Sequence, residues 1–223
     1  MRPFWQSSLF SSSRIPLRLC FFLLSALLAL GNTASADPPV ILCLGDSLTA
    51  GQGVSREESY PGLLEKRLRE RGHPHRVINA GVSGDTSAGV WRRLDWTLRS
   101  NPSLVILVIG ANDGLRGLPL DQMESNIDHI LARLQEKKIR VILGGMQIPP
   151  NYGDTYTRSF AEIYPRLAKK HAIHLLPFFL DGVAGQPALN QPDGIHPNPQ
   201  GYRIILNTMW PVLERLLSGQ PNP

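Results

Sequence analysis

A serine, Ser47, lies shortly after the apolar run 40–44. Residues 40–51 read VILCLGDSLTAG, so five apolar residues run directly into Gly45, Asp46 and Ser47. A buried strand has to surface somewhere, and Gly, Asp and Ser are ordinary turn residues. The alternative is that the turn holds a nucleophile, whose hydroxyl needs a base from elsewhere in the chain. The partners available to Ser47 therefore decide between a simple turn and a reactive one.

One of the six histidines lies in a segment that suits such a base. His196 belongs to QPDGIHPNPQG, a loop rich in Pro, Gly and Asn, and Asp193 precedes it by three residues. If this segment makes one turn, the carboxylate can accept from one imidazole nitrogen and leave the other free to face a serine. The alternative is an Asp-Gly turn beside a solvated histidine. The other histidines are expected in surface or packing roles: His73, His75, His129, His171 and His174.

An acyl-transfer site also needs donors that face the negative charge of a tetrahedral intermediate. Three groups are candidates: the backbone N–H of Ser47, the backbone N–H of Gly84 in GVSGDTS, and the side-chain amide of Asn112 in GANDGLRG. Glycine lets the backbone approach a ligand without an intervening side chain. Alternatively, Gly84 only turns the chain before a helix capped by Asp85 or Thr86, and Asn112 forms an Asx turn after a strand.

The order of the elements indicates how these residues are brought together. Short β-rich runs alternate with longer amphipathic ones, which predicts strands at 40–44, 76–79, 104–109, 141–144 and 173–176 and helices at 60–71, 86–99, 121–137, 156–170 and 200–217. This alternation predicts an α/β fold, a parallel sheet with helices on both faces. Ligands of such sheets bind at the carboxyl ends of the strands. Three strand ends present small or polar residues there: Gly45–Ser47, Asn79–Gly81 and Gly110–Asn112.

We interpret residues 1–36 as a secretory signal peptide. Arg14 and Arg18 precede the apolar run LCFFLLSALLAL, and Ala34-Ser35-Ala36 fits the small-x-small cleavage pattern. Because the apolar run is shorter than the ~20 residues of a spanning helix, we expect cleavage after Ala36 rather than an uncleaved anchor. Residues 37–223 are then expected to form a single domain that is periplasmic or secreted.

Removal of this segment changes the charge of the protein. The whole chain carries a net charge of +5, but residues 1–36 hold three arginines and no acid, which leaves +2 for the remainder. A balance this close to neutral gives no support to nucleic-acid binding. The remainder keeps one cysteine, Cys43, which cannot form an internal disulfide. Its stability must therefore come from its core.

Four blocks in order carry a resemblance to a known family. Gly45-Asp46-Ser47-Leu48, then Gly84, then Asn112, then Asp193-Gly194-Ile195-His196 resemble the pattern of the SGNH (GDSL) hydrolases. Within that family the chain is most similar to the bacterial periplasmic thioesterase I, lysophospholipase L1 and arylesterase group. The stretches NAGVSGDTS, PPNYG, IYPRLAKK and LLPFFL resemble the same group.

The resemblance implies a three-layer α/β/α sandwich with a five-stranded parallel sheet of flavodoxin-like order. It implies that Ser47 is the nucleophile, that His196 is the general base, and that Asp193 orients this base. It further implies an oxyanion hole of Ser47, Gly84 and Asn112, and neither a metal nor an organic cofactor. Asp46 is expected to tie the turn rather than to react.

Other classes of protein agree less well with the sequence. The Gly-x-Ser-x-Gly elbow is absent around Ser47, and the Gly51–Gly53 region lacks the lysine of a phosphate-binding loop. An exported glycan O-acetylesterase remains an alternative, although Trp91 and Trp96, which could form sugar platforms, are expected in the core. A catalytically inert binding protein on the same fold would be expected to lack the Ser, Asp or His that this chain retains.

The sequence thus predicts a serine hydrolase that cleaves carboxylic esters and thioesters through an acyl-enzyme intermediate. The loop Met146–Tyr156 follows the fourth strand, and we expect Ile148, Pro149 and Tyr152 to line an acyl groove, unless this loop only packs. The expected partner is a small-molecule acyl ester or thioester. We expect no nucleic-acid partner, no stable membrane anchor after signal cleavage, and a monomer.

Overall fold

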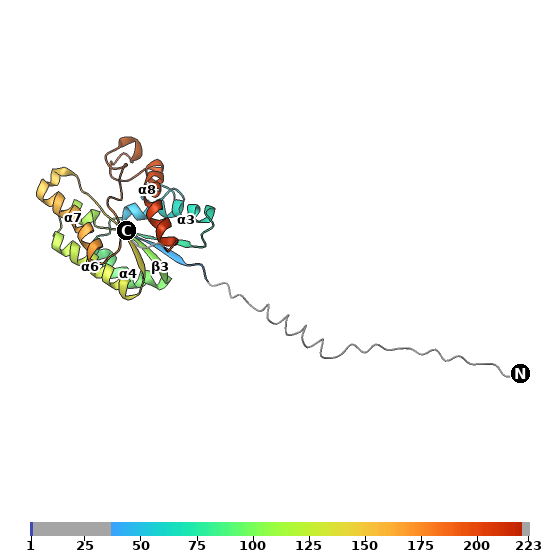
Figure 1. Ribbon diagram of the computed structural model, residues 1–223. Helices are drawn as coiled ribbons and strands as arrows, with labels where there is room; N and C mark the ends of the chain where they lie inside the picture. Colours follow the sequence, from blue (N-terminus) through green and yellow to red (C-terminus); the bar gives the residue numbers. More distant parts are fainter. Residues whose placement is uncertain (2–36, 220–223) are drawn as a thin grey trace. The chain divides into compact units, whose positions relative to one another are not determined.

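Five parallel strands form the centre of the computed structural model, which describes Met1 and residues 37–219 (Figure 1). The strands are β1 Val40–Gly45, β2 Arg76–Gly81, β3 Pro102–Val108, β4 Arg140–Gly144 and β5 His174–Leu176. Their order in the sheet is β2-β1-β3-β4-β5, and every neighbouring pair is parallel. The predicted five-stranded parallel sheet is therefore confirmed. The proposed signal peptide, residues 1–36, lies outside the described residues apart from Met1.

Helices cover both faces of this sheet. Those in the described residues are α2 Ser47–Ala50, α3 Tyr60–Glu70, α4 Ser87–Thr97, α5 Ala111–Leu115, α6 Leu120–Glu136, α7 Asp154–Lys170 and α8 Pro199–Leu217. Short 3₁₀ turns occur at Leu98–Ser100, Pro150–Tyr152 and Pro187–Leu189. Helix α6 packs between α4 and α7, whereas α3 packs against α8, and the two groups lie on opposite sides of the strands (Figure 1). This is the expected three-layer α/β/α arrangement.

Strands β1 and β3 are buried along nearly their whole length. All six residues of β1 are buried, and Leu104–Ile109, which spans the end of β3, is wholly inaccessible. Strands covered on both faces need such continuous apolar runs. The crossover from β1 leads to β2 on one side of it, and the next crossover returns from β2 past β1 to β3 on the other side. The carboxyl end of β1 is therefore the switch point at which such sheets form a crevice.

Side-chain caps fix where the helices begin. Ser59 caps α3, and Asn198 caps α8 by accepting from the N–H groups of Gln200 and Gly201 at 3.0 Å each. Thr86 caps α4, since its Oγ1 accepts from the N–H of Gly89 at 3.3 Å. Of the two caps considered for this helix, Thr86 is therefore the one used, and the Asp85 side chain is free for another contact.

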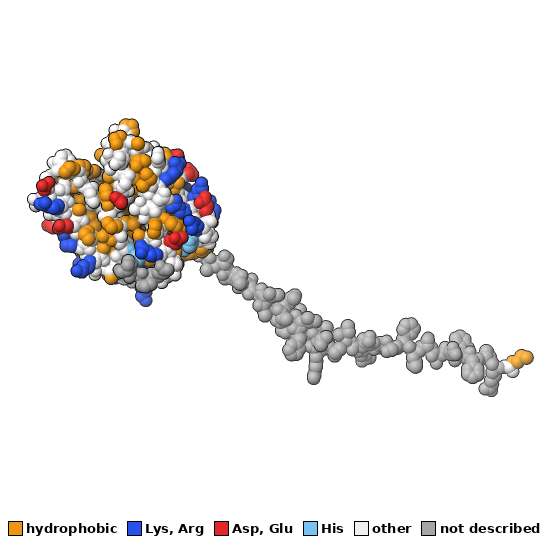
Figure 2. All heavy atoms as spheres, turned by 45° about the horizontal axis from the view of Figure 1, so that its top comes forward, with side chains coloured by type: hydrophobic (Ala, Val, Ile, Leu, Met, Phe, Trp, Pro, Cys, Tyr) orange, Lys and Arg blue, Asp and Glu red, His pale blue; other side chains and the backbone are white. Residues whose placement is uncertain are grey.

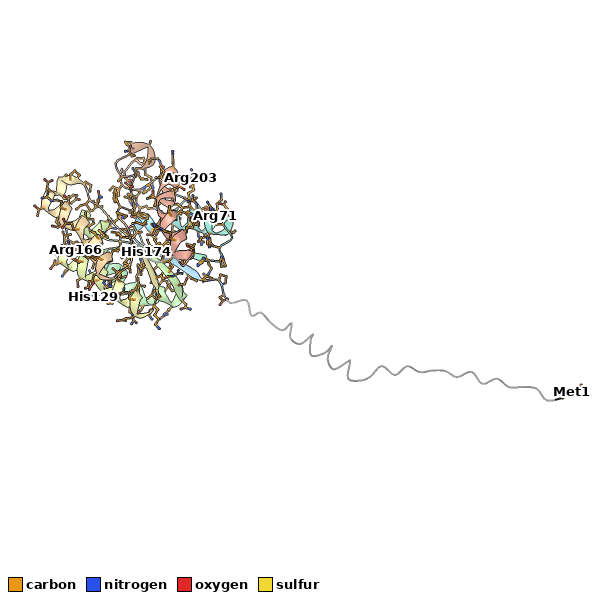
Figure 3. All side chains as sticks on the ribbon, in the orientation of Figure 1. Met1, Arg71, His129, Arg166, His174 and Arg203 are labelled. Atoms are coloured by element: carbon orange, nitrogen blue, oxygen red, sulfur yellow. The ribbon has the colours of Figure 1, made fainter. Side chains whose placement is uncertain are left out.

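Ion pairs link the helices on each side of the sheet. Arg166 Nη2 of α7 lies 2.8 Å from Glu124 Oε2 of α6, and Arg71 Nη1, just after α3, lies 3.7 Å from Glu214 Oε1 of α8. Figure 3 labels Arg166 and Arg71 on opposite sides of the ribbon. Exposed pairs of this kind contribute only about 0–1 kcal/mol each. On the face drawn in Figure 2, acidic and basic side chains are intermixed.

The two tryptophans expected in the core are exposed, so that expectation is wrong. Trp91 is 39% and Trp96 69% accessible. The buried stripe of α4 consists instead of Val90 and Leu94, one helical turn apart. Trp91 lies on the outer side and packs with its ring 5.5 Å from that of His129 on α6. Trp96 lies nine residues beyond Ser87, about 14 Å along the helix.

The residues from Pro38 onward form one compact unit. Among the helices of the described residues, none combines the length and apolar character that a membrane crossing requires. Cys43 of β1 is buried and unpaired, and its burial raises the pKa of the thiol to about 12. A thiol of this kind behaves as a small apolar side chain of the core.

Candidate active site

Ser47 is the first residue of α2, directly after the turn that ends β1. Gly45 makes this turn possible, because a Cβ at this position would overlap the carbonyl oxygen of Val108 in β3. Asp46 caps the helix, its Oδ1 accepting from the N–H of Leu48 at 3.0 Å. Ser47 itself is 9% exposed. The hydroxyl is therefore held on a short, capped helix at the carboxyl end of β1.

His196 reaches this hydroxyl from the loop before α8. Its Nε2 lies 2.8 Å from Oγ of Ser47, and its Nδ1 lies 2.7 Å from Oδ2 of Asp193. The structure thus brings all three residues singled out from the sequence into one hydrogen-bonded series. Both distances fall in the range that proton transfer between a nucleophile, a base and its orienting carboxylate requires.

Asp193 is built into its loop as an acceptor. Its Oδ1 accepts from the N–H groups of Ile195 at 2.9 Å and His196 at 3.0 Å, while Gly194 between them adopts a φ of +71°. The N–H of His196, followed by the imidazole and the N–H of Ile195, lowers the pKa of Asp193 to about 2. The carboxylate is therefore ionised near neutral pH and accepts at Nδ1 of His196.

Asp46 is a second carboxyl beside Ser47, in a different environment. It is only 1% exposed, and burial raises its pKa to about 7, against the opposing effects of the Leu48 N–H and of His196. Its contacts tie the turn, as expected from the sequence. Its Oδ2 also lies 3.4 Å from Nδ2 of Asn112.

Asn112 is the second residue of α5, which follows β3, and Gly84 lies in the loop that follows β2. Asn112 Nδ2 donates to the carbonyl oxygen of Asp85 at 2.9 Å, and its contact with Asp46 brings it next to the Ser47 turn. Gly84 has a φ of +80°, which a residue with a side chain rarely adopts. Its carbonyl oxygen accepts from Nη2 of Arg116 at 2.9 Å. Asn112 therefore contacts the Ser47 turn, and Gly84 directly precedes Asp85, whose carbonyl accepts from Asn112.

Three further residues near this turn were not among the site residues expected from the sequence. Asp85 and Arg93 form an ion pair with Arg93 Nε 2.7 Å from Asp85 Oδ2. Arg116 joins the loop after β3 to the loop after β2 through Gly84. Asp85 lies in GVSGDTS and Arg116 in GANDGLRG, so the motifs that contain Gly84 and Asn112 could have indicated these two residues as well. Arg93 lies in the middle of a helix, where the sequence gives no such signal.

The three residues expected to line an acyl groove differ in their surroundings. Ile148 is 8% exposed and packs under α5, where its Cγ2 would lie 2.8 Å from a Cβ at Gly114. Pro149 is exposed. Tyr152 is partly buried, and its hydroxyl donates to the carbonyl oxygen of Leu115 at 2.8 Å. Ile148 and Tyr152 thus contact the segment that carries Asn112.

A second hollow lies on the surface of the described part of the chain, away from Ser47. A groove of about 600 Å³ runs along β2 between Ala50 and Arg76, and neither Ser47 nor His196 lines it. Within residues 37–219, no group of three or more His, Cys, Asp or Glu side chains is arranged to hold a metal ion.

Comparison with known proteins agrees with this geometry. The sequence profile of the GDSL-like Lipase/Acylhydrolase family matches residues 43–204, which include Ser47 and His196. The chain is 40% identical over 197 residues to esterase TesA of Pseudomonas aeruginosa, covering 87% of this chain and 98% of that protein. It is 37% identical over 188 residues to thioesterase 1/protease 1/lysophospholipase L1 of Escherichia coli, covering 84% and 88% respectively.

Solved structures show the same relationship. The psychrotrophic esterase EstA from Pseudoalteromonas sp., inhibited by monoethylphosphonate, superimposes with a TM-score of 0.76 at 35% identity over 80% of this chain and 98% of that one. The family profile spans most of the chain, and the identities extend over nearly the whole length of these relatives. The chain therefore belongs to the GDSL-like lipase/acylhydrolase (SGNH hydrolase) family.

Proposed function

We propose that this protein hydrolyses carboxylic esters and thioesters, with Ser47 as nucleophile, His196 as general base and Asp193 as the residue that orients the base. The observation that carries the proposal is the series of two short contacts, 2.8 Å from Ser47 Oγ to His196 Nε2 and 2.7 Å from His196 Nδ1 to Asp193 Oδ2. A serine hydroxyl becomes a useful nucleophile when a neutral imidazole can take its proton.

In the first half-reaction, Ser47 Oγ attacks the carbonyl carbon of the ester or thioester. The proton of the hydroxyl passes to Nε2 of His196, and the carbonyl oxygen becomes an oxyanion. The ionised Asp193 stabilises the resulting imidazolium through Nδ1–H, and its low pKa supports this role. The imidazolium then donates its proton to the leaving alcohol or thiol as the bond from the carbonyl carbon to oxygen or sulfur breaks.

In the second half-reaction, water takes the place of the departed alcohol or thiol. His196 accepts a proton from this water, whose oxygen attacks the acyl carbon bound to Ser47. Breakdown of the second tetrahedral intermediate releases the carboxylic acid and returns the proton to Ser47 Oγ. The same two steps serve esters and thioesters, so the three residues do not select between the two leaving groups.

The oxyanion is expected to face the backbone N–H groups of Ser47 and Gly84 and the side-chain amide of Asn112. The contact of Asn112 with the Asp46 turn supports this arrangement. One N–H of the amide is engaged with the Asp85 carbonyl at 2.9 Å, whereas the 3.4 Å contact with Asp46 is weak. The weakly engaged hydrogen is the one that can turn to the oxyanion at little cost.

The substrate class follows from the family and from the names of the relatives. Relatives of 37–40% identity are named esterase and thioesterase 1/protease 1/lysophospholipase L1. We assign the acyl chain to the region of Ile148, Pro149 and Tyr152. The exposed tryptophans do not favour a glycan substrate, because Trp91 packs on His129 and Trp96 lies far along α4 from its first turn.

A substrate panel tests the proposed function. Purified protein and the Ser47→Ala variant are assayed with p-nitrophenyl esters of graded chain length, acyl-CoA thioesters and lysophosphatidylcholine. The proposal expects hydrolysis of at least the p-nitrophenyl esters and thioesters by the wild type and none above background by the variant. Equal rates for the two proteins would overturn it.

We further propose that the protein is exported, loses residues 1–36 and acts as a monomer without a membrane anchor. The support is the basic, apolar and small-residue order of residues 14–36 in the sequence. Mass spectrometry of protein from a bacterial periplasmic fraction should find an N-terminus at Asp37, and light scattering should give the mass of one chain. Full-length protein in the membrane fraction would contradict the proposal.

A further inference from the structure

The proposed oxyanion donors lie beyond the ends of the strands that carry them. The last ladder pairs of β1 are Gly45 with Gly81 of β2 and Gly45 with Val108 of β3. Ser47, Gly84 and Asn112 follow these pairs by two, three and four residues. The paired part of the sheet therefore ends before all three donors. Beyond it, the Val82 N–H donates to the carbonyl oxygen of Gly45 at 3.0 Å, and side-chain contacts add to this backbone bond.

Arg93 makes two of these contacts with one guanidinium group. Its Nε donates to Oδ2 of Asp85 at 2.7 Å, and its Nη2 donates to the carbonyl oxygen of Gly45 at 3.0 Å. Gly45 lies two residues before Ser47, and Asp85 directly follows Gly84. The side chain thus joins the last residue of β1 to the loop after β2.

Asp85 extends the connection to the third loop. Its carboxylate accepts from Arg93, while its backbone carbonyl accepts from Nδ2 of Asn112 at 2.9 Å. The Asp85 carboxylate packs directly against Gly89 of α4, where a Cβ would overlap its Oδ1. A continuous chain of contacts therefore runs from Gly45 through Arg93 and Asp85 to Asn112.

The surroundings strengthen this pair. The side chains of Arg93 and Asp85 are 20% and 14% exposed, so solvent screens their attraction less than in the exposed pairs between helices. The guanidinium is planar and presents two donors along one edge, which can serve a carboxylate and a carbonyl at fixed geometry. A lysine has a single ammonium and cannot reproduce both contacts in the same way.

We propose that Arg93 and Asp85 are positioning residues that hold the donors of Ser47, Gly84 and Asn112 at the spacing required by the oxyanion. This inference rests on the proposed function, because it assigns a role in the same acyl-transfer site. The pair acts through other residues and does not touch the substrate. It should therefore affect the tetrahedral state more than the binding of the substrate.

A merely structural pair would behave differently. If Arg93 and Asp85 only stabilised the fold, their loss would lower the melting temperature and leave the folded enzyme with its usual kcat. If they position the donors, kcat falls while KM changes little, because the oxyanion forms only after binding. The two possibilities are thus separated by the split between kcat and KM.

The test uses Arg93→Lys and Asp85→Asn with a matched control. Arg133→Lys is the control, since Arg133 Nε of α6 pairs with Asp95 Oδ1 of α4 at 3.1 Å, also arginine to aspartate but on the surface. Each protein is assayed with a p-nitrophenyl ester and titrated with a trifluoromethyl ketone and the matching methyl ketone. Ser47 adds to the trifluoromethyl ketone to form a hemiketal oxyanion, whereas the methyl ketone reports ground-state binding.

We expect Arg93→Lys and Asp85→Asn to lower kcat about 10- to 100-fold. Affinity for the trifluoromethyl ketone should fall by a similar factor, with affinity for the methyl ketone and KM nearly unchanged. Arg133→Lys should leave all these constants unchanged. Inhibition constants describe only the folded enzyme. The ratio of the inhibition constants of the two ketones can therefore be compared between proteins even if a variant is less stable.

Two results would overturn the inference. One is a kcat in both variants equal to that of Arg133→Lys, and the other is an equal loss of affinity for both ketones. Failure of the proposed function would be recognised separately, since Ser47→Ala would then hydrolyse the ester as fast as the wild type does.

Discussion

Nε2 of His196 lies 2.8 Å from Oγ of Ser47, although 149 residues separate them in the chain. Two contacts hold their segments together. Tyr202 of α8 donates its hydroxyl to the carbonyl oxygen of Leu48 at 3.1 Å, and Gln191 Nε2 donates to the carbonyl oxygen of Gln52 at 2.6 Å. The histidine loop is therefore fastened to the α2 segment on both sides of His196.

Ser47→Ala is expected to reduce hydrolysis of p-nitrophenyl esters by ~10³-fold or more, because it removes the proposed nucleophile. Among the described residues, the Ser47 hydroxyl forms one side-chain hydrogen bond, with His196. The melting temperature should therefore stay close to that of the wild type. Mass spectrometry after treatment with an alkyl phosphonate should find the adduct on the wild type and none on the variant. Labelling of another residue at the same rate would contradict the assignment of the nucleophile.

Asp193→Asn tests the orienting carboxylate. The neutral amide no longer stabilises an imidazolium, so kcat should fall by ~10²- to 10⁴-fold. The N–H of His196, its imidazole and the N–H of Ile195 lower the pKa of Asp193 to about 2. Because an unfolded aspartate has a pKa of about 3.9, the charge of Asp193 stabilises the native protein fully above that pH. This stabilisation is lost as the pH falls through about 2. The variant should therefore melt below the wild type near neutral pH, and the difference should shrink in acid.

The matched control for Asp193→Asn is Asp181→Asn, an exposed aspartate outside the network. It should change neither kcat nor the melting temperature at either pH. If Asp193→Asn kept the activity of the wild type, Asp193 would not be the orienting residue. A stability difference between wild type and variant that grew in acid would contradict the low pKa.

Most of the fold was predictable because its long elements have clear patterns. The run Leu104–Ile109 is apolar throughout, as a doubly covered strand requires, and the buried stripe of α6 recurs at helical spacing. The single-turn helix α2 and the short α5 were not predicted. Helices of four and five residues are not stable by themselves. The cap at Asp46 and contacts with β1 and β2 support α2, whereas α5 begins without a side-chain cap and packs against α6.

The candidate site was predictable residue by residue, but its internal contacts were not. Asp193 and His196 could be paired because Asp193 precedes His196 by three positions, whereas their link to Ser47 came from the resemblance to a family. Arg93 was missed because its partner Gly45 lies 48 residues away and is reached only when α4 folds back beside β1. The roles assigned to these residues stay predictions, which the variants described above test.

Asp46→Asn is expected to change how stability depends on pH. Burial raises the pKa of Asp46 to about 7, whereas an unfolded aspartate titrates near 3.9. Between about pH 4 and pH 7 the unfolded chain has lost this proton and the native protein retains it, so stability falls as pH rises through this window. Asparagine keeps an acceptor for the Leu48 N–H and does not titrate.

The measurement for Asp46→Asn is thermal unfolding of both proteins at several pH values across that window. The melting temperature of the wild type should fall more than that of the variant as the pH rises. Asp181→Asn again serves as the control and should follow the wild type. Parallel curves for wild type and Asp46→Asn would mean that Asp46 ionises as an ordinary exposed carboxyl does.

Ile148→Ala combined with Tyr152→Ala is expected to shift the preferred acyl chain toward longer substrates. Ile148 fills the space beneath Gly114, and Tyr152 holds the carbonyl of Leu115 at the end of α5. Truncation of both side chains opens space beside the segment that carries Asn112, and an apolar cavity favours added methylene groups by about 0.8 kcal/mol each. The ratio of kcat/KM for octanoyl to butyryl p-nitrophenyl esters should rise several-fold. Tyr152→Phe removes only the hydroxyl and should leave this ratio unchanged, whereas an unaltered chain-length profile in the double variant would show that the loop packs without touching the acyl chain.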